Sequence, residues 1–145
     1  MSELQDIFDQ IVIIQNAITA PSGEKDIAQA TDEIPAMAPM TFPSFVNIEE
    51  STDFVRPPSA RMETHTINMH FLLAPADQKY SIRTRRKWVE VIQDAFEAKI
   101  SLNGTCTQAM IMHIDYGPPE PWEGAYVGAT FRLSVEAKQT IAYAA

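Results

Sequence analysis

The stretch "RMETHTINMHFLL", residues 61–73, decides the fold, because apolar and polar residues alternate along most of its length. The apolar side is formed by Ile67, Met69, Phe71 and Leu73, and the polar side by Thr64, Thr66, Asn68 and His70. A spacing of two is the spacing at which side chains return to the same face of a β-strand. The stretch therefore predicts a strand with one face in the core.

Three further segments resemble strands, at 42–50, 105–116 and 125–137. Pro43 places the first of them at a sheet edge or at a strand start. In 105–116, alternation separates Met110, Met112 and Ile114 from Ala109 and Ile111. The 109/111 side is too apolar for simple exposure to water, so we expect it to form a subunit contact.

Two helices flank these strands. Near the N-terminus, apolar residues recur at spacings of three and four, which draws one stripe on a helix, with Ser2 as N-cap; they are Leu4, Ile7, Ile11, Ile14 and Ile18. The second helix covers roughly 83–100. The order is α-β-β-α-β-β, and it predicts one α+β domain, 1–145, with a mostly antiparallel four-stranded sheet and two helices on one face.

Residues 20–41 form an Ala/Pro-rich connection without clean periodicity. A connection of this length is unusual inside a compact domain. Two interpretations stay open: a poorly ordered surface loop, or a segment that orders only against a neighbouring subunit.

The composition of the chain argues against several classes of protein. The chain has 145 residues and a net charge of −8, and its first 33 residues hold seven acids against Lys25 alone. A free DNA-binding domain normally shows the opposite balance. No apolar run is long enough for a membrane span, and the acidic N-terminus does not resemble a secretory signal. Cys106 is the single cysteine, which fits a reducing compartment.

The acidic chain has one basic stretch, "KYSIRTRRKW" at 79–88, which contains five of its eleven Lys and Arg residues. The predicted helix start carries Arg83, Arg85, Arg86 and Lys87. Cations at that end oppose the helix dipole by only about 0.3–1 kcal/mol each, so a solvated cluster is tolerable. The alternative is pairing with carboxylates of a neighbouring subunit, which guanidinium geometry suits. The first helix and the acidic 24–33 segment are the complements.

The connection "GPPEPWEG", residues 117–124, places Trp122 near a hairpin tip stiffened by three prolines. Trp122 either folds back on its own sheet or anchors an interface, where tryptophan is enriched. Glu123 beside it and Arg56 in the other long connection complete the expected interface set.

The sequence contains few residues that suggest catalysis or metal binding. His113 and Asp115 share a strand face, but a lone His-x-Asp is a poor metal signal, and alternation separates Cys106 from His113. No glycine-rich phosphate loop is present. We therefore expect no catalytic, metal or cofactor site, and we keep a small α+β enzyme built on these three residues as the rival from another class.

The order and texture of the segments resemble the tail terminator (tail completion) proteins of long-tailed bacteriophages. The resemblance covers the first helix "LQDIFDQIVIIQNAI", the approach "IPAMAPMTFPSFVN", the strand "RMETHTINMHFLLAP", the helix with Trp88, and the last hairpin "YGPPEPWEGAYVGATFRLSVEA".

The resemblance implies a structural virion protein without enzymatic activity or cofactor. Such proteins form a ring, usually a hexamer, that caps the tail tube and joins it to the head. The implied partners are further copies, the tail tube protein and the head-closure protein, with DNA passing the lumen unbound and no membrane. Assembly would occur in the host cytoplasm. A head-closure protein or a tube subunit is the alternative.

Overall fold

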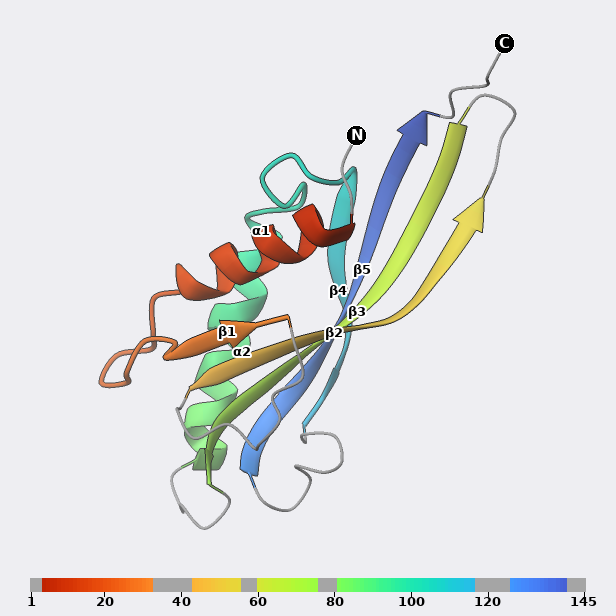
Figure 1. The fold of residues 1–145 in the computed structure, drawn as a ribbon. Coiled ribbons are helices and arrows are strands. Elements are labelled where there is room, and N and C mark those ends of the chain that lie inside the picture. The colour runs from red at the N-terminus through yellow and green to blue at the C-terminus, as the bar shows by residue number, and fades with distance from the viewer. Residues whose placement is uncertain (1–3, 33–42, 56–59, 76–80, 117–125, 141–145) are drawn as a thin grey trace.

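The computed structural model describes residues 4–32, 43–55, 60–75, 81–116 and 126–140 (Figure 1). Its elements follow the chain as α1 (Leu4–Asn16), β1 (Gln29–Thr31), β2 (Ser44–Val55), β3 (Ala60–Pro75), α2 (Ser81–Glu97), β4 (Gln108–Asp115) and β5 (Tyr126–Thr140). The fold is α+β, with one five-stranded sheet in the order β1-β2-β3-β5-β4.

The predicted mostly antiparallel four-stranded sheet is wrong, because the sheet has a fifth strand and is mixed. β1 runs parallel to β2, with Gln29 beside Ser44 and Thr31 beside Val46. This strand lies inside the 20–41 connection, and three residues are too few to show a period of two. Tertiary contacts hold it instead: Ala30 packs against the core, and the Asn47 side chain donates to the Thr31 carbonyl at 3.1 Å.

The core lies between the two helices and one face of the sheet. α1 contributes Ile7, Phe8, Ile11 and Ile14, α2 contributes Trp88, Val89, Ile92 and Phe96, and the three central strands contribute most of the rest. The ring centroids of Phe45 and Phe71 are 5.0 Å apart, and those of Phe71 and Trp88 are 5.3 Å apart. Tilted rings at such distances pack favourably beyond the area they bury.

One buried polar contact fixes α1 on the sheet. Gln15 and Asn47 are both fully buried, and their side-chain amides bond reciprocally at 2.6 and 2.7 Å. Each amide thereby satisfies the other, so that neither is left without a partner in the core.

The expected subunit contact on the 109/111 side of β4 is wrong. Ala109 lies opposite Val135 and Ile111 opposite Leu133, two core residues of β5. Cross-strand partners share a face, so Ala109 and Ile111 point toward α2. The register then shifts at Met112, and this bulge returns Ile114 to the core side. Met110 and Met112 are the exposed large hydrophobic residues of the strand.

The other strands and the second helix differ from expectation mainly in their ends. β2 continues to Val55, through residues expected to belong to a connection, after a register shift at Glu50. α2 ends at Glu97, and Leu102, Asn103 and Gly104 follow with positive φ angles of 46°, 58° and 90°. These left-handed residues reverse the chain toward β4. None of the described helices is long and apolar enough to cross a membrane.

Candidate interaction surface

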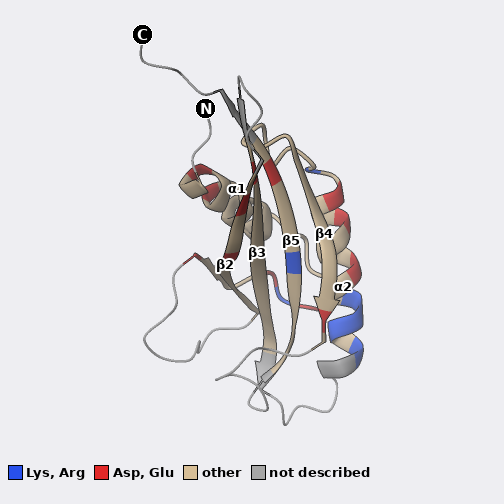
Figure 2. Cartoon of the chain, turned by 90° about the vertical axis from the view of Figure 1, so that its right-hand side faces the viewer, with Lys and Arg blue, Asp and Glu red and all other residues tan. Residues whose placement is uncertain are grey.

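The basic residues predicted at the start of the second helix lie in the first turns of α2 (blue in Figure 2). Arg83, Arg86 and Lys87 are exposed, whereas Arg85 is half-buried. The structure therefore divides the predicted cluster into one packed arginine and three exposed cations.

Arg85 connects the start of α2 to the end of β4. Its Nη1 donates to the carbonyl of Tyr116 at 3.2 Å, and its guanidinium carbon lies 5.1 Å from the centroid of the Tyr116 ring. A cation over an aromatic face is attracted by the ring quadrupole. Arg85 is therefore engaged within the subunit.

The three exposed cations form no ion pair with any carboxylate among the described residues. They begin a charged stripe that runs the length of α2 and changes sign halfway (Figure 2). The stripe consists of Arg83, Arg86, Lys87, Glu90, Asp94 and Glu97, all exposed.

The stripe opposes helix stability at both ends. No acid lies in the first turn of α2 and no base in its last turn, which is the reverse of what the helix dipole favours. Arg83 and Lys87 are like charges four residues apart, and so are Glu90 and Asp94, and such pairs are mildly destabilising. Arg86 and Glu90 are opposite charges at the favourable spacing of four, so folding of the subunit explains the middle of the stripe but not the charges at its two ends.

Beside the stripe lies an open strand edge. β4 is the last strand of the sheet, and β5 is its one strand neighbour among the described residues. The Ala109 N–H points away from β5 and donates to the Ile100 carbonyl at 2.7 Å. From Ile111 to Asp115 no described strand pairs with that edge. An open edge offers unpaired N–H and C=O groups to an incoming strand.

Apolar side chains are concentrated around this edge. Six large hydrophobic side chains are exposed in the described part of the chain, and four of them are Ile100 (53%), Met110 (48%), Met112 (62%) and Tyr116 (56%). Between α2 and β4 lies a groove of about 180 Å³, lined by Gln93, Phe96, Glu97, Ile100 and residues 108–111. Small-molecule sites usually occupy about 300–1,000 Å³. The groove is better sized for one or two side chains of a protein partner.

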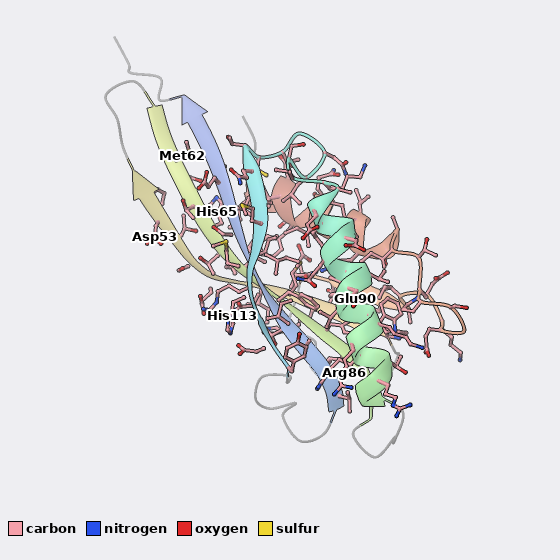
Figure 3. The ribbon with its side chains drawn as sticks, turned by 180° about the vertical axis from the view of Figure 1, so that it is seen from behind. Asp53, Met62, His65, Arg86, Glu90 and His113 are labelled. Carbon is pink, nitrogen blue, oxygen red and sulfur yellow. The ribbon has the colours of Figure 1, made fainter. Side chains whose placement is uncertain are left out.

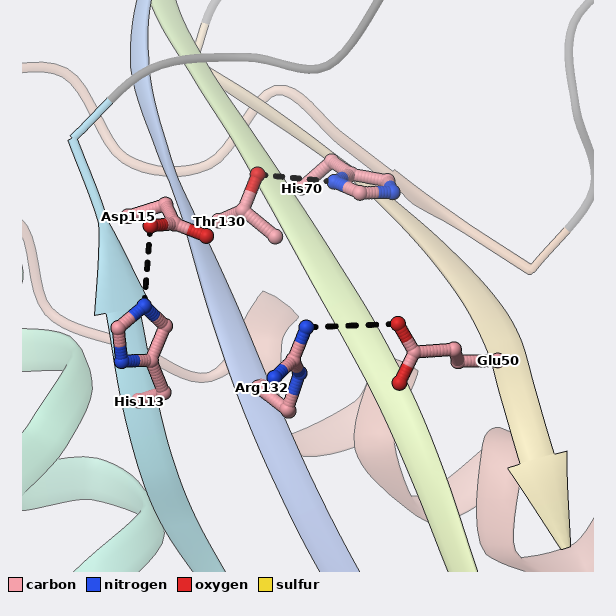
Figure 4. Close-up of polar contacts among 6 residues, drawn as sticks. All are labelled: Glu50, His70, His113, Asp115, Thr130 and Arg132. Atoms are coloured by element: carbon pink, nitrogen blue, oxygen red, sulfur yellow. Dashed lines mark hydrogen bonds and ion pairs between the residues drawn. The ribbon is translucent and has the colours of Figure 1, made fainter.

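The residues of the rival enzyme do not form a site. His113 Nε2 lies 3.0 Å from Asp115 Oδ1, but both side chains are more than half exposed (Figure 4). Cys106 packs against the core on the other face of the sheet. Its burial raises the pKa of the thiol to about 11, so that Cys106 is a neutral thiol at pH 7. No group of three or more metal-ligating side chains occurs in the described residues.

The face of the sheet away from the helices carries polar contacts as well (Figure 4). Arg132 Nη2 lies 3.4 Å from Glu50 Oε1, and His70 Nδ1 lies 3.0 Å from Thr130 Oγ1. Burial lowers the pKa of His70 to about 4, so this imidazole is neutral at pH 7. These contacts stabilise neighbouring strands and do not converge on a pocket.

From the sequence we did not predict a set of linked polar contacts that is buried on the other face of the sheet, the face that the helices cover. His65 bonds through Nδ1 to the Thr52 hydroxyl at 2.8 Å and through Nε2 to Glu63 at 3.1 Å. The side chains of His65 and Glu63 are only 5% and 8% exposed, so a substrate has no access to them. Their i, i+2 spacing on one strand face was the signal that they would meet.

The remaining predicted interface residues, Arg56, Trp122 and Glu123, lie outside the described residues. The open edge of β4 was not predicted, because it depends on the order of the strands in the sheet, which no local segment contains. No protein-family model and no curated protein matches the chain.

Proposed function

We propose that this chain is a structural subunit that assembles into a ring, and that the ring is the tail terminator of a long-tailed bacteriophage. The observation that supports assembly is the charged stripe of α2 beside the open apolar edge of β4. The phage assignment rests on the resemblance of the segment order to that family.

Head-to-tail assembly requires two different surfaces on each subunit, and a closing rotation turns it into a ring. The exposed cations of α2 supply one charge sign. Acids on other parts of the surface, such as Asp26, Asp32 and Asp9, supply the other. The net charge of −8 leaves the subunit with little attraction for phosphate, which suits a lumen through which DNA passes without specific binding.

In the particle, the ring would contact the tail tube protein on one side and the head-closure protein on the other. Light scattering and negative-stain electron microscopy of the purified chain test assembly, and closed rings are expected. Labelled protein in intact particles tests the position, which is expected at the junction of head and tail. Label along the tube or on the head side of the neck would favour a tube subunit or a head-closure protein instead.

The rival enzyme is tested by replacing Cys106, His113 and Asp115 with alanine together. His113 and Asp115 lie in β4, but strand pairing uses backbone groups and not these side chains, so ring formation and particle assembly are expected to survive. Turnover of a substrate by the purified chain, lost in this triple variant, would contradict the structural proposal.

A further inference from the structure

A row of five side chains follows the flank of α2 that borders β4. Gln93 and Glu97 belong to it, because they line the groove between α2 and β4. Arg83, Arg86 and Glu90 precede them at spacings of three and four, which place side chains on the same side of a helix. The four charged side chains of the row are exposed. The row therefore begins with two cations and continues with an acid, a neutral amide and a second acid.

α2 and β4 run in opposite directions, and their midpoints are level with each other. Near the start of α2, Arg85 donates to the carbonyl of Tyr116, which follows the end of β4. The last turns of α2 line the groove with residues 108–111, at the start of β4. Glu90, in the middle of the row, and His113, in the middle of the open edge, lie at a similar height (Figure 3). One axis of symmetry can therefore pass beside the midpoints of both elements.

A second copy of the chain matches both halves of the row. When the copy is turned by a twofold axis beside Glu90, the basic half of each row faces the acidic half of the other. Arg83 then faces Glu97 of the second copy, and Arg86 lies opposite Gln93. The two Glu90 carboxylates approach each other near the axis, where the two Arg86 side chains offset their repulsion. A partner of a single charge sign would match only one half of the row.

The same axis brings exposed apolar side chains of the two copies together. Ile100 lies beside the start of β4, since its carbonyl accepts the Ala109 N–H at 2.7 Å, whereas Tyr116 follows the end of the strand. In two antiparallel edges, Ile100 of each copy approaches Tyr116 of the other. Met112 lies near the axis and approaches Met112 of the second copy. All three side chains are more than half exposed in the free subunit, and the contact covers them.

We propose that the free subunit forms a dimer about this twofold axis, with α2 antiparallel to α2 and the open edge of β4 antiparallel to its counterpart. The dimer is a state of the chain before assembly, and its existence does not depend on the ring. The ring proposed above uses the cations of α2, and so does the dimer, so that a subunit cannot take part in both. A dimer needs fewer copies than a ring and is favoured at low protein concentration. It covers the assembly surface until ring formation displaces it.

Site-specific cross-linking tests the axis, because a residue near a twofold axis approaches its own copy, unlike a residue in a head-to-tail contact. In a Cys106→Ala background, Met112→Cys is treated with a short bis-maleimide at low protein concentration, and a cross-linked dimer is expected. Ile13→Cys, exposed to a similar degree but on α1, is the matched control and should give little product. Equal yields from Met112→Cys and Ile13→Cys would overturn the inference.

Charge exchange between the two ends of the row tests the orientation of α2. R83E and E97R should each weaken dimerisation about tenfold at low salt, because a like-charge pair then lies on both sides of the axis. The double variant R83E/E97R should recover dimerisation, since each row again presents opposite charges to the other. Glu24→Arg, the same change as E97R at an exposed position outside the contact, should leave dimerisation unchanged.

Sedimentation at several concentrations measures the dissociation constant of each variant, and circular dichroism checks that each is folded. A folded R83E/E97R variant that dimerises no better than the single variants would show that the cations face other acids. The twofold contact would then be wrong.

Dimerisation and ring formation can fail separately. A chain that passes from monomers to rings without a dimer at any concentration would overturn the inference and leave the proposed function standing. A dimer with the expected cross-link, in a chain that never forms rings with or without tail tubes, would contradict the proposed function and leave the dimer standing. A chain that stays monomeric under all these conditions would overturn both.

Discussion

The two helices pack on the same face of the sheet, but burial and the helix dipole explain more of the α1 sequence than of the α2 sequence. In α1, the buried stripe packs on the core, Asp6 lies in the first turn where the dipole favours an acid, and Gln15 bonds to Asn47. In α2, the buried stripe is equally complete, but the first turn carries Arg83 where the dipole favours an acid, and the last turn carries Glu97 where it favours a base. Folding accounts for the inner faces of both helices, and the dipole accounts for Asp6 of α1 but not for the charges at the two ends of α2. The association proposed above would account for those charges.

The largest effect is expected where α1 is buried. Ile7 and Ile11 are both 0% exposed, and replacing both with Asp buries two unpaired carboxylates at a cost of several kcal/mol each. Domains are stable by only about 5–15 kcal/mol, so the variant should be unfolded by circular dichroism. Ile13→Asp, on the exposed side of the same helix, should remain folded. A folded I7D/I11D variant would contradict the packing of α1 on the sheet.

The inner face of α2 should respond almost as strongly. Trp88 is fully buried against Phe71, and Trp88→Ala should lower the free energy of unfolding by about 3–5 kcal/mol through lost burial and a cavity. Lys87→Ala, at the adjacent exposed position, should change it by less than about 0.5 kcal/mol. Urea unfolding measures both. Equal effects at the two positions would mean that α2 does not present Trp88 to the core.

The polar contact between α1 and β2 is expected to matter less. Gln15→Leu leaves the buried Asn47 amide short of a partner and should cost about 1–3 kcal/mol. The double variant Q15L/N47L removes both amides and should regain part of that loss. Additive losses in the double variant would show that the two amides do not depend on each other.

The smallest effect on the free energy of unfolding is expected at the outer face of α2. There the substitution should raise the stability, whereas the substitutions above lower it. In R83E, an acid replaces the cation in the first turn of α2 and the like-charge pair with Lys87 is removed, which should stabilise the monomer by about 0.3–1 kcal/mol at low salt. Thermal unfolding at a concentration below association measures it. The same variant is expected to associate poorly, so stability and assembly should move in opposite directions. A loss of monomer stability would mean that the replaced positive charge stabilises the folded subunit.

Local pattern predicted the long elements and their faces, because periods of two and 3.6 directly reflect burial. The alternation at 61–73 gives β3, and the stripe from Leu4 to Ile14 gives α1. It failed for β1, whose three residues have no period, and for the two sides of β4. Both sides of β4 are apolar, so only its register on β5 and the cover by α2 determine which side is buried.

For the candidate surface, too, local sequence predicts some features and tertiary structure decides the others. The concentration of Arg and Lys at 83–87 is visible in the sequence, but its separation into a packed Arg85 and three exposed cations depends on Tyr116, 31 residues away from Arg85. That β1 and β4 are the end strands of the sheet is a property of strand order, which no local segment contains.

The sequence by itself determined which segments are helices and long strands and where the positive charge lies, since these depend on neighbours along the chain. The tertiary structure alone decided that a short fifth strand runs parallel to β2, which side of β4 is buried, and which strands end the sheet. Those choices depend on contacts between segments far apart in the chain, where burial and register outweigh local preference.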